Sequence, residues 1–478
     1  MEMMMDRRDR GRAWPATCSL VAALAASTLL PVGCALKKPP DAATIKGESM
    51  AKVAVPPQWT AAGAGTGAVT DNWVTTFHDD QLTAAVMEAI ANNPDLDVGA
   101  ARVEQAMLYA KLAGATLYPS VDLLGRTGLK MSGDNSGLKG ALLSMTWELD
   151  LWGRVRYGRA AAVADARSAE ADYEYARQSM AAVVARSWFL ATEAGLQAQV
   201  ARDTIQGGEE LIRLAQSRTQ VGVGNDEDVY VARANVGTYR DTLRQIELSR
   251  EQAIRALEIL LGRYPAAAAA VTAQLPNQPA PVPAGLPSEL LERRPDVIAA
   301  ERRVAAAFNR IGEAKAARLP SIALTAGVSA ISSDLFVLKD HDNPVWNLGA
   351  RLLMPIYKGG ALKTQVDIRT AEQKQAIASY ASVGLRAFGE VENALAAEFA
   401  AREREQILAQ TLADNQRALD IVQNQFKIGS TDLRFVTQRQ LALTATQSAL
   451  VRMQAEQRVQ RVNVHLALGG SFETRPQP

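Results

Sequence analysis

Hydrophobic and polar positions alternate in two pairs of segments. In the first pair, Thr127 and apolar residues at 121, 123, 129 and 131 alternate with Asp122, Arg126 and Lys130. The polar turn SGDNSG leads into a second alternating segment at 141–149. In the second pair, segments at 321–330 and 346–354, the latter with Arg351 on its polar side, flank a longer turn. Such alternation is typical of strands with one apolar and one polar face. The pattern predicts two β-hairpins, 120–149 and 321–355.

The remaining chain has the composition of long packed helices, rich in Ala, Gln, Arg and Glu, with no proline between residues 153 and 264 or between 356 and 475. A helix of roughly 70 residues would be on the order of 100 Å long and would need lateral partners to be stable. Each hairpin is expected to follow one helix and to precede two more. The expected helices are 79–117, 152–221 and 225–262 in the first half and 287–318, 358–428 and 432–469 in the second.

The two halves repeat each other. Pro94 and Pro119 have the same separation as Pro295 and Pro320, and each pair is followed by the same residues, Asp and Ser. Further on, the Gly222–Gly262 spacing recurs at 429–469. The first block repeats at an offset of 201 residues and the second at 207. The turn of the second hairpin (332–343) is six residues longer than that of the first (132–137), which accounts for the difference. These features predict an internal duplication.

Strands of about ten residues with one apolar face suit an outer-membrane β-barrel, in which every backbone group must be paired. Four strands cannot close a barrel alone, since the smallest such barrels have about eight. Three copies would give twelve strands, with Asp122, Arg126, Lys130 and Arg351 facing a wet lumen. The predicted fold is therefore a membrane β-barrel joined to long helices and shared by a trimer. The alternative is a soluble two-hairpin protein with helical arms, which would leave the export signal unexplained.

The N-terminus has the features of an export signal, with charged residues, the apolar run SLVAALAASTLL and then PVGC. This pattern predicts a lipoprotein signal peptide at 1–33 and lipidation of Cys34. Pro31 stands where leucine is usual, so the alternative is an ordinary signal peptide. The predicted domains are an N-terminal extended segment (34–70), a first repeat (71–270), a Pro-rich linker (271–286), a second repeat (287–470) and a tail (471–478).

The stretch TWELDLWGR marks the predicted change from strand to helix. Trp147 and Trp152 suit the aromatic belt at a membrane interface, and Gly153 permits the bend. In the second half PIYKGG is expected to do the same. There Pro355 ends the strand, and Gly359 and Gly360 supply the bend.

Composition excludes several functions. The formal net charge of +1 gives no reason to expect a nucleic-acid partner. Both cysteines, Cys18 and Cys34, lie in the N-terminal leader and its processing site, and the three histidines are far apart in the chain. No motif of a hydrolase, a metalloprotease or a phosphate-binding loop is present. We therefore expect no enzyme activity, no cofactor apart from a covalent lipid on Cys34, and no metal site.

Seven stretches carry a resemblance to a known family. They are NNPDL (92–96), LYPS (117–120), TWELDLWGR (146–154), GLPSELLERRPDV (285–297), ARLPSIALT (317–325), PIYKGG (355–360) and GEVENAL (389–395). In these stretches the chain resembles the trimeric outer-membrane efflux proteins related to TolC, in particular the OprM and NodT branch of lipoproteins. The resemblance covers about residues 71–470.

The resemblance implies a homotrimer with a twelve-stranded barrel in the outer membrane and a helical tunnel in the periplasm. It implies two protein partners, a periplasmic adaptor and an inner-membrane pump of the resistance-nodulation-division type. The chain would be a lipid-anchored passive duct for antibiotics and other toxic compounds. Export of proteins, metals or organic acids through the same kind of channel remains an alternative, as does a soluble periplasmic scaffold or adaptor. The sequence does not identify the exported compound.

The resemblance also implies a periplasmic gate at two helix-turn-helix tips, QVGVGNDEDV (220–229) and FKIGSTDLRF (426–435). Asp226, Glu227 and Asp228 from three protomers would form an acidic ring whose charges repel one another on closing. In the second tip Phe435 and Gln438 stand where relatives often carry acidic residues. Asp432 and Arg434 are the remaining candidates there for a salt link. Both tips are also expected to contact the adaptor. The alternative is that all these charges are solvated turn residues.

Overall fold

The computed structural model describes residues 36–61, 67, 69, 71–126, 139–332 and 345–473. The chain divides into two compact units, which are treated separately below. The sheet unit comprises the described residues within Met1–Pro39, Ala110–Ala162 and Ala307–Gln373. The helical unit comprises those within Pro40–Tyr109, Val163–Ala306 and Lys374–Pro478. Cys34 and Lys130 lie outside the described residues, as does the apolar part of the export signal.

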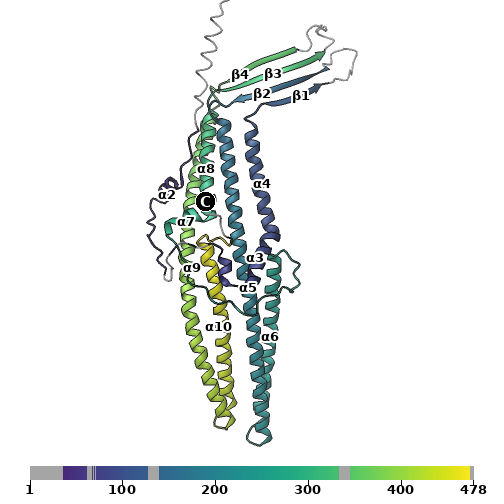
Figure 1. Ribbon diagram of the computed structural model, residues 1–478, viewed down its shortest axis with the longest axis vertical. Coiled ribbons are helices and arrows are strands. Elements are labelled where there is room, and N and C mark those ends of the chain that lie inside the picture. Colours follow the sequence, from purple (N-terminus) through teal and green to yellow (C-terminus); the bar gives the residue numbers. More distant parts are fainter. Residues whose placement is uncertain are drawn as a thin grey trace, which may run out of the picture. The chain divides into compact units, whose positions relative to one another are not determined.

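The sheet unit contains the two predicted hairpins, which join into one four-stranded antiparallel sheet (Figure 1). Its strand order is β1-β2-β3-β4, and the two hairpins meet through β2 and β3. The strands are β1 (Ser120–Arg126), β2 (Lys139–Leu149), β3 (Ser321–Ser332) and β4 (Val345–Leu353).

Register separates the sheet into an apolar and a mainly polar face, because residues paired across strands share a face. One row of paired residues is Leu123, Leu143, Val328 and Trp346, and its neighbour contains Met145, Ala326 and Leu348. On the opposite face the rows are Asp122, Ser144, Gly327 and Asn347, and then Glu148, Ala323 and Arg351. The predicted alternation is therefore present in the described parts of the four strands, whereas its positions 127, 129 and 131 lie outside the described residues.

Both outer strands of the sheet are uncovered. Leu123 on β1 is 73% exposed, and Leu348 on β4 is 88% exposed. Every residue of β4 is exposed. An uncovered edge offers unpaired backbone groups to another strand, and contiguous exposed apolar residues mark a surface that contacts a partner or a membrane.

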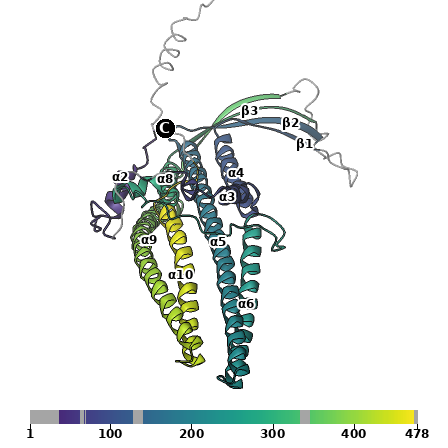
Figure 2. The ribbon, with the colours of Figure 1, turned by 60° about the horizontal axis from the view of Figure 1, so that its bottom comes forward.

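Two very long helices leave the sheet unit and continue into the helical unit. They are α5 (Arg154–Gln220) and α9 (Ala361–Lys427), of 67 residues each. Each is followed by a 35-residue helix that runs back along it, α6 (Asp226–Leu260) beside α5 and α10 (Leu433–Ala467) beside α9 (Figures 1 and 2). All four boundaries repeat at an offset of 207 residues. Among the described residues, no helix combines the length and the hydropathy that crossing a bilayer would require.

The single helices expected before the hairpins are wrong, because each is broken in two. The pieces are α3 (Asp80–Asn92) and α4 (Pro94–Ala115) in the first half, and α7 (Pro287–Arg293) and α8 (Pro295–Ala316) in the second. A proline disfavours helical conformation in the residue before it. Asn93 and Arg294, which precede the two prolines, are accordingly extended, with ψ of 121° and 125°.

The two break residues hold equivalent places in the repeats. Asn93 donates through Nδ2 to the carbonyl of Leu260 at 2.9 Å, near the end of α6. Arg294 donates through Nη1 to the carbonyl of Ala467 at 3.1 Å, at the end of α10, and pairs with Asp296 and Glu390. Burial acts to lower the pKa of Arg294, but these two carboxylates outweigh it and hold the pKa above its ordinary value. Each side chain thus satisfies a terminal helix carbonyl.

The N-terminal and C-terminal segments differ from the sequence prediction. The segment 34–70, expected to be extended, contains a helix, α2 (Ala42–Ser49), whose Ile45 is buried. At the other end, Phe472 of the expected tail is 3% exposed and packs in a core cluster with Trp73, Phe189 and Leu257. The termini therefore contribute core residues that their composition does not reveal.

His465 lies in the core rather than in a site. Its ring stacks on that of Trp73 at 5.7 Å between centroids. Burial, together with the charge of Arg461, lowers the pKa of His465 to about 3. The imidazole is therefore neutral at physiological pH and acts as a packing residue.

Candidate functional site

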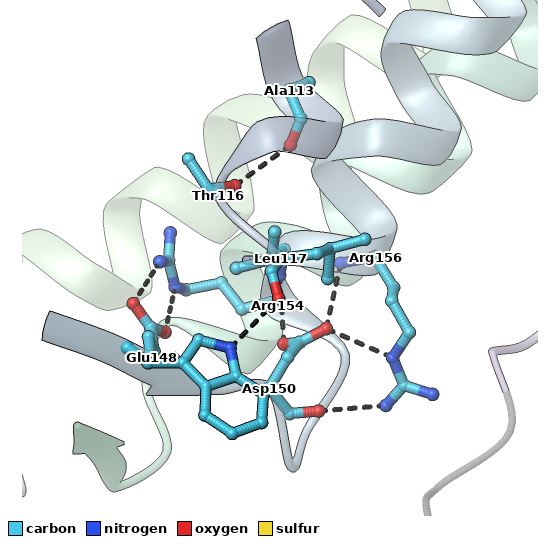
Figure 3. A network of polar contacts seen from close by, with 9 residues as sticks. Ala113, Thr116, Leu117, Glu148, Asp150, Arg154 and Arg156 are labelled. Atoms are coloured by element: carbon cyan, nitrogen blue, oxygen red, sulfur yellow. Dashed lines mark hydrogen bonds and ion pairs between the residues drawn. The ribbon is translucent and has the colours of Figure 1, made fainter. Parts of the chain in front are cut away.

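The first strand-to-helix joint, residues 148–156, is held by Asp150 (Figure 3). The amide groups of the first helical turn have no partner within the helix. The Asp150 carboxylate accepts from two of them, the N–H groups of Val155 at 3.0 Å and Arg156 at 2.9 Å. It also accepts from the Arg156 guanidinium at 3.1 Å. A negative charge at this position is favoured by the helix dipole of α5.

A second ion pair ties the end of β2 to the start of α5. Arg154 donates to both oxygens of Glu148, at 3.0 and 2.7 Å (Figure 3). A planar guanidinium that meets a carboxylate in this way fixes direction as well as distance. The charged residues of WELDLWGRVR therefore fix the end of the strand to the start of the helix. The sequence analysis did not assign them this role.

The two tryptophans of the joint bind neighbouring backbone. Trp147 donates through Nε1 to the carbonyl of Leu117 at 3.0 Å, and Trp152 donates to the carbonyl of Pro320 at 2.7 Å. Trp152 is 39% exposed, and Trp147 is half-buried. Their proposed place in an interfacial aromatic belt stays a prediction. The hydrogen bonds give both residues a structural role in either case.

Gly153 is required by the backbone. Its φ is +76°, and a Cβ atom there would lie 2.7 Å from Cδ2 of Leu36. Close by, the amide of Lys37 donates to the hydroxyl of Tyr157 at 3.0 Å. Leu36 and Lys37, the first described residues, are therefore packed against this joint.

The second joint, residues 355–360, shares with the first a glycine of positive φ directly before the helix but has different side chains. Gly359 and Gly360 have φ of +58° and +84°, as the predicted bend requires. Tyr357, which stands 207 residues after Asp150, is 86% exposed, and Ile356 beside it is 83% exposed. Pro355 follows the end of β4 at Leu353. No carboxylate caps α9 as Asp150 caps α5 in the described part of the chain.

The residues predicted to face a lumen are only partly brought together. Asp122 and Arg351 lie on the same, mainly polar face of the sheet. Arg126 is the last residue of β1, and Lys130 lies outside the described residues. Their position along a lumen stays a prediction.

The first helical tip gathers negative charge at the start of α6. Asn225 caps this helix by accepting from the amide of Asp228 at 2.8 Å, and Asp226, Glu227 and Asp228 occupy its first turn. Burial raises the pKa of Asp228, Asp432 and Glu227 add to the rise, and Arg218 opposes it. The carboxylates of Asp228 and Asp432, from different tips of one chain, therefore repel each other electrostatically.

The salt link considered between Asp432 and Arg434 does not form within this chain, as far as the described residues show. Asp432 precedes α10 without a side-chain capping hydrogen bond. The guanidinium of Arg434 instead lies over the ring of its neighbour Phe435, 5.5 Å from the centroid. The role of both residues in a gate stays a prediction.

Arg218 connects the two tips, and sequence reasoning missed it. It lies in the last turn of α5 and donates to the carbonyl of Phe426 at the end of α9, and at 3.3 Å to the carbonyl of Val223. Its guanidinium also covers the Phe426 ring, 4.5 Å from the centroid. A cation in the last turn of a helix interacts favourably with terminal carbonyls. The only sequence signal was that the aligned residue of the second repeat, Gln425, is uncharged.

Comparisons with known proteins identify the family. Residues 85–263 and 286–470 match the family model "Outer membrane efflux protein". The chain is 28% identical over 429 residues to the cation efflux system protein CusC of Escherichia coli. This alignment covers 88% of this chain and 93% of CusC. It is 30% identical over 421 residues to the antibiotic efflux pump outer membrane protein ArpC of Pseudomonas putida, with 86% and 87% covered.

A solved structure gives the same result at the level of the fold. The open state of the MtrE outer membrane channel of Neisseria gonorrhoeae superposes with a TM-score of 0.77 at 25% identity, covering 93% of this chain and 99% of MtrE. The match extends over both repeats. The chain therefore belongs to the outer membrane efflux protein family, and it is an outer-membrane channel of an efflux system rather than an enzyme.

Proposed function

We propose that three copies of this chain close a twelve-stranded barrel and that each barrel is a passive duct for toxic small molecules. The observation that carries the proposal is the sheet with its apolar face and two uncovered edges, β1 and β4. A lone four-stranded sheet leaves backbone groups unpaired, which is costly in lipid. Joining β4 of one copy to β1 of the next removes all edges after three copies and directs Asp122 and Arg351 to the interior.

The long helices would continue this duct into the periplasm. Helices of 67 residues reach on the order of 100 Å, and they need neighbours over this whole length. The partners proposed are a periplasmic adaptor at the tips and an inner-membrane pump of the resistance-nodulation-division type. The names of ArpC and CusC, which refer to an efflux pump and an efflux system, support this assignment.

A lipid on Cys34 is part of the proposal. Leu36 lies against Gly153, and Lys37 is hydrogen-bonded to Tyr157, so the chain just after Cys34 starts beside the first joint. If the joint lies at the membrane surface, an acyl chain on Cys34 reaches lipid directly. Mass spectrometry of the N-terminal peptide from the mature protein tests this proposal, and an unmodified Cys34 contradicts it.

Trimer formation is tested by the mass of the detergent-extracted protein. We expect three chains per particle. A matched pair of variants places the contact: Leu348→Arg on the exposed apolar face of β4 should reduce insertion and trimer yield, whereas Asn347→Arg on the polar face should not. A stable monomer with the full β-sheet signal in circular dichroism contradicts the shared barrel.

The cargo is proposed to be antibiotics and similar toxic compounds, as the name of ArpC suggests. The test compares compound accumulation in a strain lacking this protein with the same strain after restoration. It covers antibiotics, dyes, organic acids and metal ions. We expect antibiotics to accumulate and to fall on restoration. An effect limited to metal ions would instead favour a role like the one that the name of CusC describes. An effect limited to secreted proteins would contradict small-molecule export.

The gate is proposed to lie at the acidic tip. Changing Asp226, Glu227 and Asp228 together to Ala should lower the leak of the channel in planar bilayers, because the variant removes acidic charges of the first turn that would repel one another when the tips close. A triple variant of Glu403, Asp414 and Asp420 removes the same charge from exposed positions of α9 and is the control. Equal conductance in all three proteins removes these residues from the gate.

A further inference from the structure

A cavity of about 460 Å³ lies in the helical unit between α5, α9 and α10, and neither the joints nor the tips use it. Its polar lining is Tyr175, Arg186, Glu390, Asn393, Gln460 and Asn463, and its apolar lining consists mainly of alanine and leucine side chains, among them Ala397 and Leu466. Ligand sites combine a few polar groups with an apolar wall in this way.

Arg186 brings an unmatched positive charge to this cavity. It is half-buried, and its guanidinium donates to Oδ1 of Asn463 at 3.1 Å. Among the described residues it forms no ion pair, whereas the buried Arg294 and Arg461 each have a carboxylate partner. Burial lowers the pKa of Arg186, with Tyr175 as the one group that opposes the shift. A partly desolvated cation held by a neutral amide is a natural partner for an anion.

Glu390, the one carboxylate of the cavity lining, does not neutralise Arg186. Its oxygens are engaged by Arg294 at 2.7 Å and by Arg386 at 3.7 Å. Arg294 in turn binds Asp296 at 2.8 Å. The charges around Glu390 therefore balance among themselves, and the charge of Arg186 remains available to a ligand.

The cavity and the linker lie on opposite sides of α10. Arg458 and Arg461 of α10 donate to the carbonyls of Pro276 and Ala280 in the segment between the repeats. At about 100° per residue, Gln460 and Asn463 lie on the opposite side of the same helix. A trimer that carries the linker on its outer surface would turn this side of α10 toward the interior of the tunnel.

We propose that this cavity is a binding site for a small organic anion. The acid group would pair with Arg186, the amides of Gln460, Asn463 and Asn393 would supply further hydrogen bonds, and the apolar body would lie on Ala397 and Leu466. The site itself depends only on the helical unit. Its use as a contact for cargo inside the channel rests on the proposed function.

The test uses the full-length purified protein in detergent and the probe 2-naphthoate, with titration calorimetry as the readout. The neutral 2-naphthamide has the same body without the charge. We expect 2-naphthoate to bind and Arg186→Gln to weaken it at least about tenfold, as expected when a charged hydrogen-bonding partner is removed. Arg213→Gln removes a charge from an exposed position of the same helix and should leave the affinity within about twofold.

A second variant keeps the test decisive if Arg186→Gln folds poorly. Ala397→Leu retains Arg186 and fills the cavity, and it should also weaken 2-naphthoate binding. Equal binding of 2-naphthoate and 2-naphthamide to the native protein overturns the proposal, as does native affinity in both cavity variants or no binding at all. Since the assay measures binding and not transport, its failure leaves the accumulation test of the channel unaffected.

Discussion

The two strand-to-helix joints share the positive φ of the glycine before the helix and differ in their side chains. In the first, Asp150 accepts hydrogen bonds from two amides of α5, and Glu148 pairs with Arg154. In the second, Tyr357 stands at the position of Asp150 and is exposed. Gly153 and Gly360 nevertheless have similar φ values, +76° and +84°, and each lies directly before its 67-residue helix. A positive φ can be met at low cost only by glycine, whereas a helix start can be capped by several groups or by water.

The two helical tips likewise share a glycine conformation and differ in their side chains. Gly222 and Gly429 have φ of +77° and +81°, so the two turns share their conformation. The side chains around them differ. The first tip places Asp226, Glu227 and Asp228 where the second has Leu433, Arg434 and Phe435, and it has Arg218 in place of Gln425. The two turns thus have similar glycine conformations and differ in charge. One tip is acidic, and Arg218 connects it to the other.

The largest expected effect comes from the first joint. Asp150→Ala removes the acceptor of two helix amides and of the Arg156 guanidinium, and it should lower the free energy of unfolding by about 2–3 kcal/mol. Tyr357→Ala at the equivalent exposed position should change it by less than about 0.5 kcal/mol. Thermal unfolding followed by circular dichroism in detergent measures both. Equal effects would show that the joints are stabilised in the same way after all.

The next effect concerns the tips. Arg218→Gln makes the first tip resemble the second and removes the bonds to Phe426 and Val223, at a local cost of about 1–2 kcal/mol. Hydrogen exchange at residues 221–225 and 426–430 should become about 5- to 30-fold faster. Gln425→Ala is the control. Gln425, the equivalent residue of the second repeat, accepts from the Ser430 amide at 2.9 Å through its backbone carbonyl, which the substitution retains. Unchanged exchange in Arg218→Gln would mean that Arg218 does not hold the tips together.

The glycines give a smaller difference. Gly153→Ala and Gly360→Ala both force alanine into the left-handed region, which costs about 1 kcal/mol. Gly153→Ala also brings Cβ to 2.7 Å from Leu36, whereas nothing lies within 4 Å at Gly360. The unfolding midpoint should therefore fall further for Gly153→Ala. Leu36→Ala added to this variant should recover the difference, and a purely additive result would rule out the contact as its cause.

The smallest expected effect is the pH dependence of the acidic tip. The pKa of Asp228 is raised in the folded protein, so its carboxylate binds a proton more tightly there than in the unfolded chain. Its stability should rise as the pH falls from the raised pKa towards 3.8, the ordinary value, and the leak of the channel should fall with it. Asp228→Asn should remove this dependence, and Asp241→Asn, on the same helix, should keep it. A leak that rises on acidification contradicts the assignment.

Much of the fold could be predicted from local patterns. Alternation gave the four strands, and runs free of proline gave the two 67-residue helices and the helices that return beside them. The helix breaks at Pro94 and Pro295 also follow from the residue types, although the overall pattern predicts continuous helices there. The restriction that proline places on the preceding residue decided the outcome there. Of the predicted site residues, the joint glycines were found because their conformation depends on the residue type alone.

The clamp at Asp150, the Arg218 link and the cavity at Arg186 could not be predicted in this way. Some of these contacts join residues far apart in the sequence, such as Arg218 with Phe426 or Arg186 with Asn463. Others give a charged residue a partner that composition does not reveal. The sequence by itself determined the elements, their lengths and the duplication, because periodicity and backbone preference act within a few residues. Only the tertiary structure decided which charges are paired and which remain free, since that depends on packing between helices that are hundreds of residues apart.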